Sequence, residues 1–102
     1  PSLTMHLHPE PFNRIKSGDK TVEVRINDEK RRSLHVGDTI TFISRADGDE
    51  TLTRTVSALH VFDTFEQLFE QFPEERCDIY EYYSREEEEK HGVVAIELVH
   101  TK

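Results

Sequence analysis

The chain has 102 residues, enough for one small domain with a modest hydrophobic core and too few for two domains. Its residues are 34% hydrophobic and 33% charged, a composition that indicates a folded globular protein and argues against disorder. The net charge of −8 argues against a protein that coats nucleic-acid duplexes, because such proteins are normally basic.

The chain opens with a predicted strand and a predicted helix. Residues 3–8, LTMHLH, alternate between apolar and polar side chains, which predicts a strand with one apolar face. Residues 9–18, PEPFNRIKSG, predict a helix, since proline suits the first helical turn and Phe12 and Ile15 share one face. Gly18 suits the left-handed conformation that often ends a helix.

The second predicted strand carries an uncommon set of charges. Residues 20–26 read KTVEVRI, and alternation turns the three apolar side chains toward a core. Glu23 and Arg25 then share the opposite face, with Lys20 at the start of the strand. This arrangement predicts either a ligand site or a structural Glu23–Arg25 ion pair, and the residues alone favour neither.

As a ligand site, these side chains suit several kinds of chemistry. Arg25 presents a planar fork that fits a phosphate or the carbonyl edge of a base. Glu23 can accept a hydrogen bond from the exocyclic amine of a base such as cytosine. Alternatively, Glu23 and Lys20 can work as an acid–base pair in a hydrolysis.

A polar, basic segment follows. Residues 27–32, NDEKRR, are expected to form a mobile loop, with Asn27 or Asp28 capping its turn. Residues 1–36 hold seven Lys and Arg against five Asp and Glu, whereas the rest of the chain holds six against sixteen. A local cationic site on an acidic protein suits a small anionic ligand or a few nucleotides of single strand. The loop residues that can contact phosphates, or simply be solvated, are Lys30, Arg31 and Arg32.

Two strands are predicted next. Residues 39–46, TITFISRA, and 51–62, TLTRTVSALHVF, alternate in polarity, and residues 47–50, DGDE, form a hairpin-type turn between them. The two strands are therefore predicted to pair antiparallel through this turn.

The remaining elements are two helices and a strand. Residues 64–72 predict a helix with one apolar stripe, capped by Asp63 or Thr64. A second helix is predicted over 78–90 and a last strand over 93–100. The order β-α-β-β-β-α-α-β predicts a mainly β, α+β fold: a small curved sheet or barrel with helices packed at its ends.

Several of these features together resemble the ASCH domain family of small PUA-like β-barrels. The resemblance covers residues 6–43 strongly and extends to the last strand at 92–99. Its hallmark is a helix, a G-x-K-x-x-E-x-R run and a G-D turn into a strand, found here as Gly18, Lys20, Glu23, Arg25 and Gly37–Asp38. Residues 1–102 are accordingly expected to form one ASCH domain.

The resemblance implies a cleft lined by Lys20, Glu23 and Arg25 and a ligand related to RNA or nucleotides. Arg31 occupies a position that is often basic in the family. One branch is an amidohydrolase that removes the acetyl group from N4-acetylcytidine, and ribonuclease activity is known in another. The amidohydrolase branch uses a lysine, a threonine three residues on and a downstream glutamate. Here Lys20 matches and Glu23 occupies the threonine position, while residues 66–89 offer many candidates for the glutamate.

Aromatic and histidine residues give weaker signals. His8, just before Pro9, is expected near the mouth of the cleft. The alternative is that the histidines are simply hydrogen-bonded or exposed and have no role in a site. Tyr80, Tyr82 and Tyr83 offer stacking surfaces for a base. Of these, Tyr80 is expected to pack on the barrel, and the other two stay open between packing and stacking. The histidines show no metal-binding spacing, so no metal and no cofactor are expected.

We predict a binding domain for single-stranded RNA or a modified nucleoside, with a small hydrolase and, more distantly, a protein-interaction domain as alternatives. Lys20 and Glu23 are the candidate catalytic residues. No apolar run approaches the roughly 20 residues that a membrane helix needs. The single cysteine, Cys77, excludes an internal disulfide and favours a cytoplasmic location.

Overall fold

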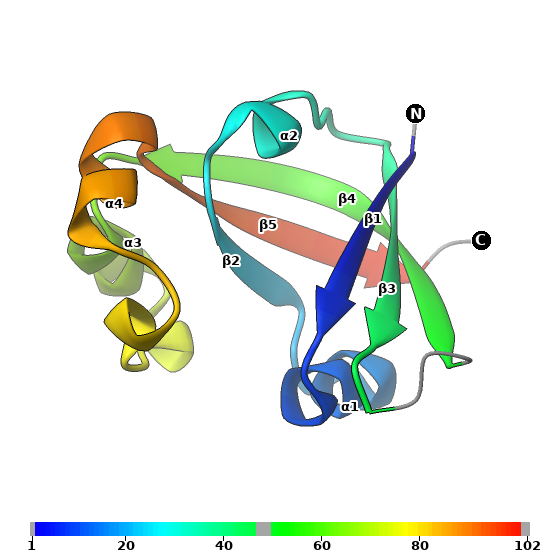
Figure 1. Ribbon diagram of the computed structural model, residues 1–102. Coiled ribbons are helices and arrows are strands. Elements are labelled where there is room, and N and C mark those ends of the chain that lie inside the picture. Colours follow the sequence, from blue (N-terminus) through cyan, green and yellow to red (C-terminus); the bar gives the residue numbers. More distant parts are fainter. Residues whose placement is uncertain (1, 47–49, 101–102) are drawn as a thin grey trace.

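Residues 2–46 and 50–100, which a computed structural model describes, form five strands, four α-helices and two short 3₁₀ helices (Figure 1). In chain order these are β1 (Ser2–Leu7), α1 (Pro9–Ser17), β2 (Val22–Ile26), α2 (Glu29–Arg32), β3 (Thr39–Ser44), β4 (Thr51–Phe62), α3 (Phe65–Gln71), η1 (Pro73–Glu75), η2 (Ile79–Glu81), α4 (Arg85–His91) and β5 (Val93–His100). The predicted hairpin turn falls largely on residues 47–49, which lie outside the described residues.

The strands form one sheet in the order β1-β3-β4-β5-β2. β1 and β3 are parallel, and the other neighbouring strands are antiparallel. The sheet curls into a half-barrel whose two edges are β1 and β2 (Figure 1). The expectation of a mainly β, α+β fold with packed helices is confirmed, and the curled sheet is consistent with a PUA-like barrel.

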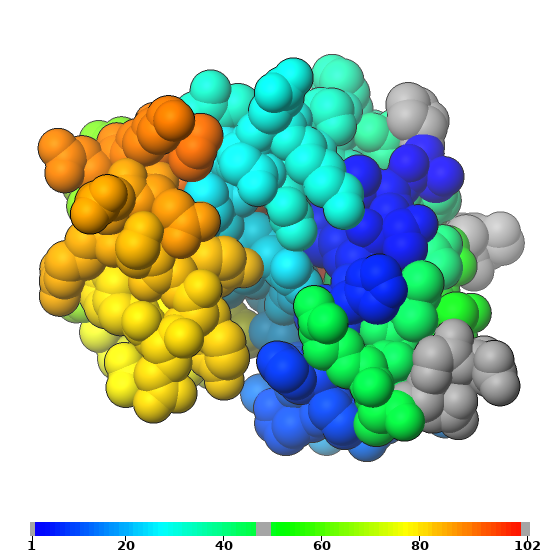
Figure 2. All heavy atoms as spheres, in the orientation of Figure 1, coloured from blue at the N-terminus to red at the C-terminus, as the bar shows by residue number. Residues whose placement is uncertain are grey.

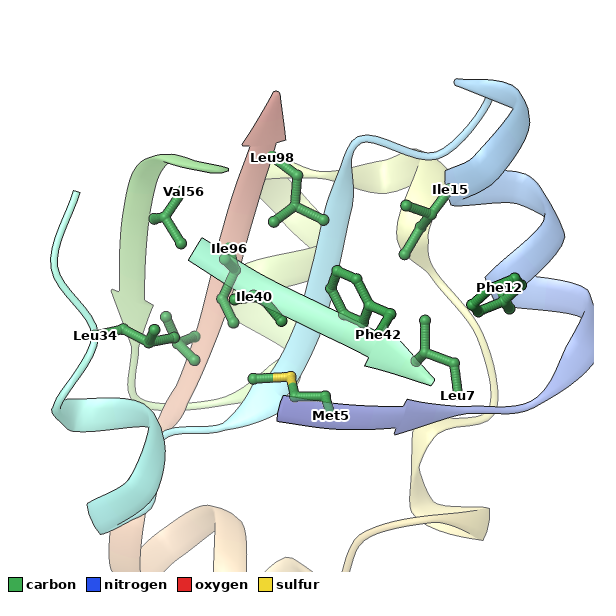
Figure 3. Close-up of a cluster of buried hydrophobic side chains, with 11 residues drawn as sticks. Met5, Leu7, Phe12, Ile15, Leu34, Ile40, Phe42, Val56, Ile96 and Leu98 are labelled. Carbon is green, nitrogen blue, oxygen red and sulfur yellow. The ribbon is translucent and has the colours of Figure 1, made fainter. Parts of the chain in front are cut away.

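One hydrophobic core fills the concave side of the sheet beside α1 (Figure 3). The alternating apolar residues of β1 and β3 point into it, and Met5 and Phe42 are almost completely buried. Phe12 and Ile15 of α1 pack against the same cluster, as their shared helical face predicts. Gly18 ends α1 with a φ of 91°, a left-handed conformation that glycine adopts without strain.

A second hydrophobic core lies between α3 and the strands β2 and β5. The apolar stripe predicted for α3 is buried there, with Phe65, Leu68 and Phe69 each at most 3% exposed. The helix begins at Phe65 because the Thr64 side chain accepts a hydrogen bond from the backbone N–H of Gln67. Of the two predicted caps, Thr64 is therefore correct.

Two predictions for the polar segments are wrong. The expected mobile loop contains the short helix α2, which begins where Asp28 accepts a hydrogen bond from the backbone N–H of Arg31. The single helix expected over 78–90 is broken into η2 and α4. Ser84 and Glu87 form a capping box that starts α4, so the backbone at Ser84 is extended and cannot continue η2.

Candidate functional site

A cavity of about 490 Å³ lies between the edge strands of the sheet and the segment that joins α3 to α4. Figure 2 shows this hollow between the yellow lobe and the blue and cyan segments. Its walls come from the start of α1, from β2 and from the η1–η2 segment. Segments far apart in the sequence therefore meet around one space.

The second strand delivers the predicted charged residues to this cavity. The backbone N–H of Lys20 donates to the carbonyl of Arg14 at 3.0 Å, which fixes the chain just before β2. β2 pairs with β5, and strand alternation turns Glu23 and Arg25 to the cavity side. Lys20 and Glu23 are only 8% and 6% exposed. Their charges are thus held largely out of water.

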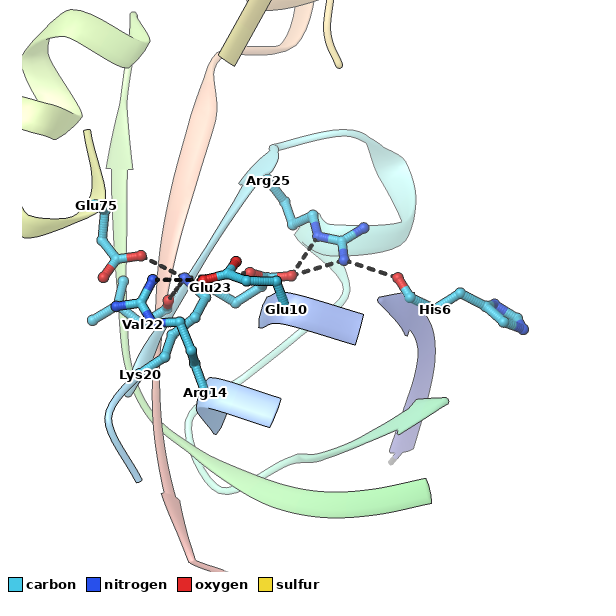
Figure 4. A network of polar contacts seen from close by, with 8 residues as sticks. All are labelled: His6, Glu10, Arg14, Lys20, Val22, Glu23, Arg25 and Glu75. Carbon is cyan, nitrogen blue, oxygen red and sulfur yellow. Dashed lines mark hydrogen bonds and ion pairs between the residues drawn. The ribbon is translucent and has the colours of Figure 1, made fainter. Parts of the chain in front are cut away.

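Lys20 lies between two carboxylates (Figure 4). Its Nζ donates to the carbonyl of Val22 at 2.5 Å and to the carboxylate of Glu75. The same Nζ lies 3.7 Å from Oε1 of Glu23, an ion pair beyond hydrogen-bond distance. Because an ammonium has three donors, one proton of Lys20 remains available to a ligand.

Arg25 connects the two edges of the sheet. Its Nε and Nη2 donate to Oε2 of Glu23 at 3.1 and 2.8 Å, and Nη2 also reaches the backbone carbonyl of His6 on β1 at 3.3 Å (Figure 4). Burial lowers the pKa of Arg25, but the Glu23 carboxylate and Tyr83 outweigh burial and raise it. The guanidinium is therefore always charged, and it has five N–H donors, more than its contacts with Glu23, His6 and Tyr83 need.

Glu75 is the downstream carboxylate that sequence reasoning did not single out. It ends η1, the turn that Pro73 starts after α3, and its side chain is 7% exposed. One oxygen accepts from Lys20, and the other makes no hydrogen bond within the parts of the chain that the structure describes. Glu75 lines the cavity and so presents an acceptor to it.

The other predicted site residues divide into two groups. His8 and Tyr83 line the cavity with Lys20, Glu23 and Arg25. Arg31 does not line it, because its guanidinium turns back to the carboxylate of Asp28, with Nη1 at 3.1 Å from Oδ2.

The neighbouring basic residues of α2 are also held by the fold. The Lys30 ammonium donates to the Thr4 carbonyl at 3.0 Å. The Arg32 guanidinium donates to the carbonyls of Asn27 and His91 at 2.8 and 3.1 Å. These bonds fix the two side chains against the fold, so only their remaining donors can meet a phosphate.

The tyrosines differ from expectation. Tyr80 is 38% exposed, and its hydroxyl donates to Glu88, so it is not a core residue. Tyr83 stacks on Phe65 with ring centroids 5.6 Å apart and is half-buried beside Arg25. Burial raises the pKa of Tyr83, and the nearby Arg25 opposes this, so its hydroxyl is neutral at physiological pH. Tyr82, one of the two tyrosines left open by the sequence, lines the cavity with 63% of its surface exposed.

The charges around the cavity are balanced at its wall and mixed at its rim, where Glu10 and Glu74 lie among the arginines. Two cations and two carboxylates form the buried cluster, which is therefore neutral overall: Lys20, Arg25, Glu23 and Glu75. Arg45 lines the cavity with no side-chain partner in the described part of the chain, whereas Arg76 is bonded to Glu66. Such a site suits a neutral polar group inside and an anion at the rim.

No group of three His, Cys, Asp or Glu side chains able to hold a metal ion occurs among residues 2–46 and 50–100. Within the same residues, no helix is long and apolar enough to cross a bilayer.

Cys77 offers a test of the electrostatics of this cavity. Burial raises the pKa of its thiol above the ordinary value of 9.0, with Lys20 lowering it and Glu75 raising it. We expect alkylation of Cys77 by iodoacetamide to be slow at pH 8 and still to accelerate above pH 9, because the thiolate is the reactive form. Glu75→Gln is expected to shift this profile to lower pH. An alkylation rate that stops rising with pH below pH 8.5 would show that the pKa of the Cys77 thiol is not raised and would contradict this prediction.

The curled five-stranded sheet with packed helices is consistent with the fold of an ASCH domain. The model of the ASCH domain matches residues 5–102, and the chain belongs to the ASCH domain family, which is generally thought to bind RNA. No curated protein matches the chain.

Solved structures agree with this assignment. The crystal structure of the hypothetical protein PH0355 is 32% identical, with a TM-score of 0.80 over 96% of this chain and 97% of that one. The solution structure of protein PF0455 from Pyrococcus furiosus is also 32% identical, with a TM-score of 0.73 over 96% of each chain. An S128A mutant of ZmASCH from Zymomonas mobilis is 18% identical, with a TM-score of 0.67 over 94% of this chain and 66% of that one, and shares the fold.

Proposed function

We propose that this protein binds a nucleoside in the cavity, either free and modified or as one unit of single-stranded RNA. The observation that carries this proposal is the neutral cluster of Lys20, Glu23, Arg25 and Glu75 in the wall of the cavity. The cavity volume of about 490 Å³ falls in the range of small-molecule sites, about 300–1,000 Å³. A nucleobase is a neutral, planar group that needs donors and acceptors placed side by side.

The free groups of the cluster match the polar edge of a base. The unpaired oxygen of Glu75 can accept from an exocyclic amine, as carboxylates do from cytosine. The remaining proton of Lys20 and a remaining N–H of the Arg25 guanidinium can donate to a carbonyl oxygen. In this arrangement Glu23 holds Lys20 and Arg25 in place through its ion pairs with them. It does not contact the ligand itself.

The rim supplies contacts for phosphate. Arg45 has no side-chain partner among residues 2–46 and 50–100, and Arg14 has only an exposed ion pair with Glu10 at 3.7 Å. Both guanidiniums can therefore turn to a phosphate at little cost. A nucleotide within single-stranded RNA gains these contacts, and a free nucleoside does not.

The first test is the substitution Glu75→Gln, which keeps the shape of the side chain and removes its charge. We expect it to weaken nucleoside binding about tenfold to hundredfold, because a hydrogen bond to a charged group contributes about 1.5–3 kcal/mol. Isothermal titration calorimetry with N4-acetylcytidine, cytidine and a short single-stranded RNA measures the effect. The matched control is Glu70→Gln, an exposed residue of α3 that does not line the cavity and should bind as the wild type does. Equal affinities for the two variants would contradict the proposed role of Glu75.

A second function, hydrolysis of an N-acyl group from the bound nucleoside, is favoured by the bond between Lys20 and Glu75. This lysine–glutamate pair corresponds to two of the three residues expected in the amidohydrolase branch. Glu23 supplies no hydroxyl, so we propose water as the nucleophile, with Glu75 taking its proton. The water oxygen adds to the acyl carbon and the Lys20 ammonium stabilises the resulting tetrahedral oxyanion; the amide C–N bond then breaks as Glu75 passes the proton to the departing amine.

Turnover is tested by incubating the protein with N4-acetylcytidine and measuring cytidine and acetate by chromatography. Loss of product with Lys20→Met and with Glu75→Gln would support the hydrolase. Tight binding with the ligand recovered intact would leave the protein as a binding domain. A denaturing gel on the RNA samples detects phosphodiester cleavage in the same way.

A further inference from the structure

We propose that His8 and Tyr82 form a slot at the cavity that stacks on both faces of one nucleobase. This inference rests on the proposed nucleoside-binding function and adds the groups that recognise the flat surface of the base. The two rings come from separate segments, the junction of β1 with α1 and the end of η2, and both line the cavity. In Figure 2 these segments form the blue and yellow sides of the hollow.

The spacing of the rings is slightly less than a single intervening base needs, so the slot admits a base when the exposed Tyr82 ring turns outward. Their centroids are 6.4 Å apart. Successive bases in a stacked strand are about 3.4 Å apart, so a base between two rings needs about 6.8 Å. The ring planes are tilted by 42°, and Tyr82, at 63% exposure, has room to turn parallel to a ligand.

Neither ring has a structural role that explains its position. His8 is the N-cap residue of α1, yet its side chain makes no capping hydrogen bond. The Tyr82 hydroxyl makes no hydrogen bond within the described residues, and most of its ring is exposed. The other two tyrosines are engaged by the fold, Tyr80 through Glu88 and Tyr83 through Phe65. An exposed aromatic pair beside a polar cavity is the arrangement by which single-stranded nucleic acid binders hold a base.

The slot also explains how the polar cluster can be selective. A base held between two rings is confined to a plane, so that only its edge can reach the groups deeper in the cavity. Stacking tolerates any base, while the Glu75 acceptor and the Lys20 and Arg25 donors distinguish one edge from another. The ligand class is therefore a nucleobase presented edge-first, in a free nucleoside or at an unpaired position of RNA.

The experiment compares the wild type with Tyr82→Ala, Tyr82→Phe and His8→Ala, titrated with N4-acetylcytidine and with a cytidine-containing single-stranded RNA. We expect Tyr82→Ala and His8→Ala each to weaken binding about tenfold, and Tyr82→Phe to bind as the wild type does. The control is His35→Ala, which removes a histidine that is 79% exposed and does not line the cavity. Base protons should shift upfield in the NMR spectrum of the bound ligand, and Tyr82→Ala should reduce that shift.

The outcomes separate the slot from the proposed function. Wild-type affinity in both alanine variants, together with weakened binding by Glu75→Gln, would overturn the slot and leave the nucleoside site standing. No binding of either probe by the wild type would overturn both. Weakened binding of both probes supports a slot that serves a free nucleoside. Weakened binding of RNA alone also supports the slot and assigns it to a nucleotide within a strand.

Discussion

Substitution of Glu88 by alanine is expected to lower the free energy of unfolding by about 3 kcal/mol, because two donors lose a charged acceptor. Glu88 is 7% exposed and lies in α4. One of its oxygens accepts from the backbone N–H of Phe65 at 2.7 Å, and both accept from the Tyr80 hydroxyl at 2.9 and 3.0 Å. The side chain therefore joins α4 to the first turn of α3 and to η2. A carboxylate at the N-terminus of α3 is also favoured by the helix dipole.

The measurement is urea denaturation followed by circular dichroism, with Glu89→Ala as the matched control. Glu89 follows directly in the same helix and is exposed, so its loss should change the stability by no more than about 0.5 kcal/mol. A domain of this kind is stable by about 5–15 kcal/mol in total, so the Glu88 variant should show a clear shift of the midpoint. Similar midpoints for the two variants would show that Glu88 does not hold these segments together.

The second large effect is expected from Lys20→Met, which removes the cation between Glu23 and Glu75. Glu23 keeps its two bonds from Arg25, whereas Glu75 loses its partner in the described structure while its side chain stays 7% exposed. Removing one partner of a buried ion pair typically costs about 3–5 kcal/mol, so we expect a loss near the lower end, about 3 kcal/mol. The same variant should bind no nucleoside measurably, since the cavity then exposes an uncompensated carboxylate.

A double substitution separates the charge effect from packing. Replacing Lys20 by methionine and Glu75 by leucine together should recover most of the lost stability, because an apolar pair of similar volume often matches a buried ion pair. Nucleoside binding should remain absent in the double variant. If the double variant is as unstable as the sum of the two single variants, Lys20 and Glu75 do not act as a pair.

Local patterns determined much of the fold correctly. The two-residue period of β1 and β3 and the apolar faces of α1 and α3 follow from backbone geometry, which is set over a few residues. The errors lie where local signals compete. Residues 78–90 contain enough helix-forming glutamates to predict one helix, but Ser84 starts a new one through its capping box. The helix α2 is a single turn of polar residues after Asp28. It is too short to show the apolar periodicity by which a helix is recognised in a sequence.

Three residues of the cavity cluster could be named from the sequence because they share one strand. Lys20, Glu23 and Arg25 lie within six residues, so strand alternation alone turns Glu23 and Arg25 to the same side. His8 and Tyr83 were also anticipated, from the edge of a predicted element and from an aromatic cluster. Their contacts with particular neighbours were not.

The fourth member of the cluster was decided by the tertiary structure alone. Glu75 is 55 residues from Lys20, in a stretch where glutamates are frequent and none is distinguished by its neighbours. The same holds for the pairing of His8 with Tyr82 and for the choice of Glu88 over the three other glutamates of the run at 86–89. Sequence periodicity reports which face a side chain occupies, because that depends on local backbone geometry. Which distant face it meets depends on the path of the whole chain and on which packing buries the most apolar surface.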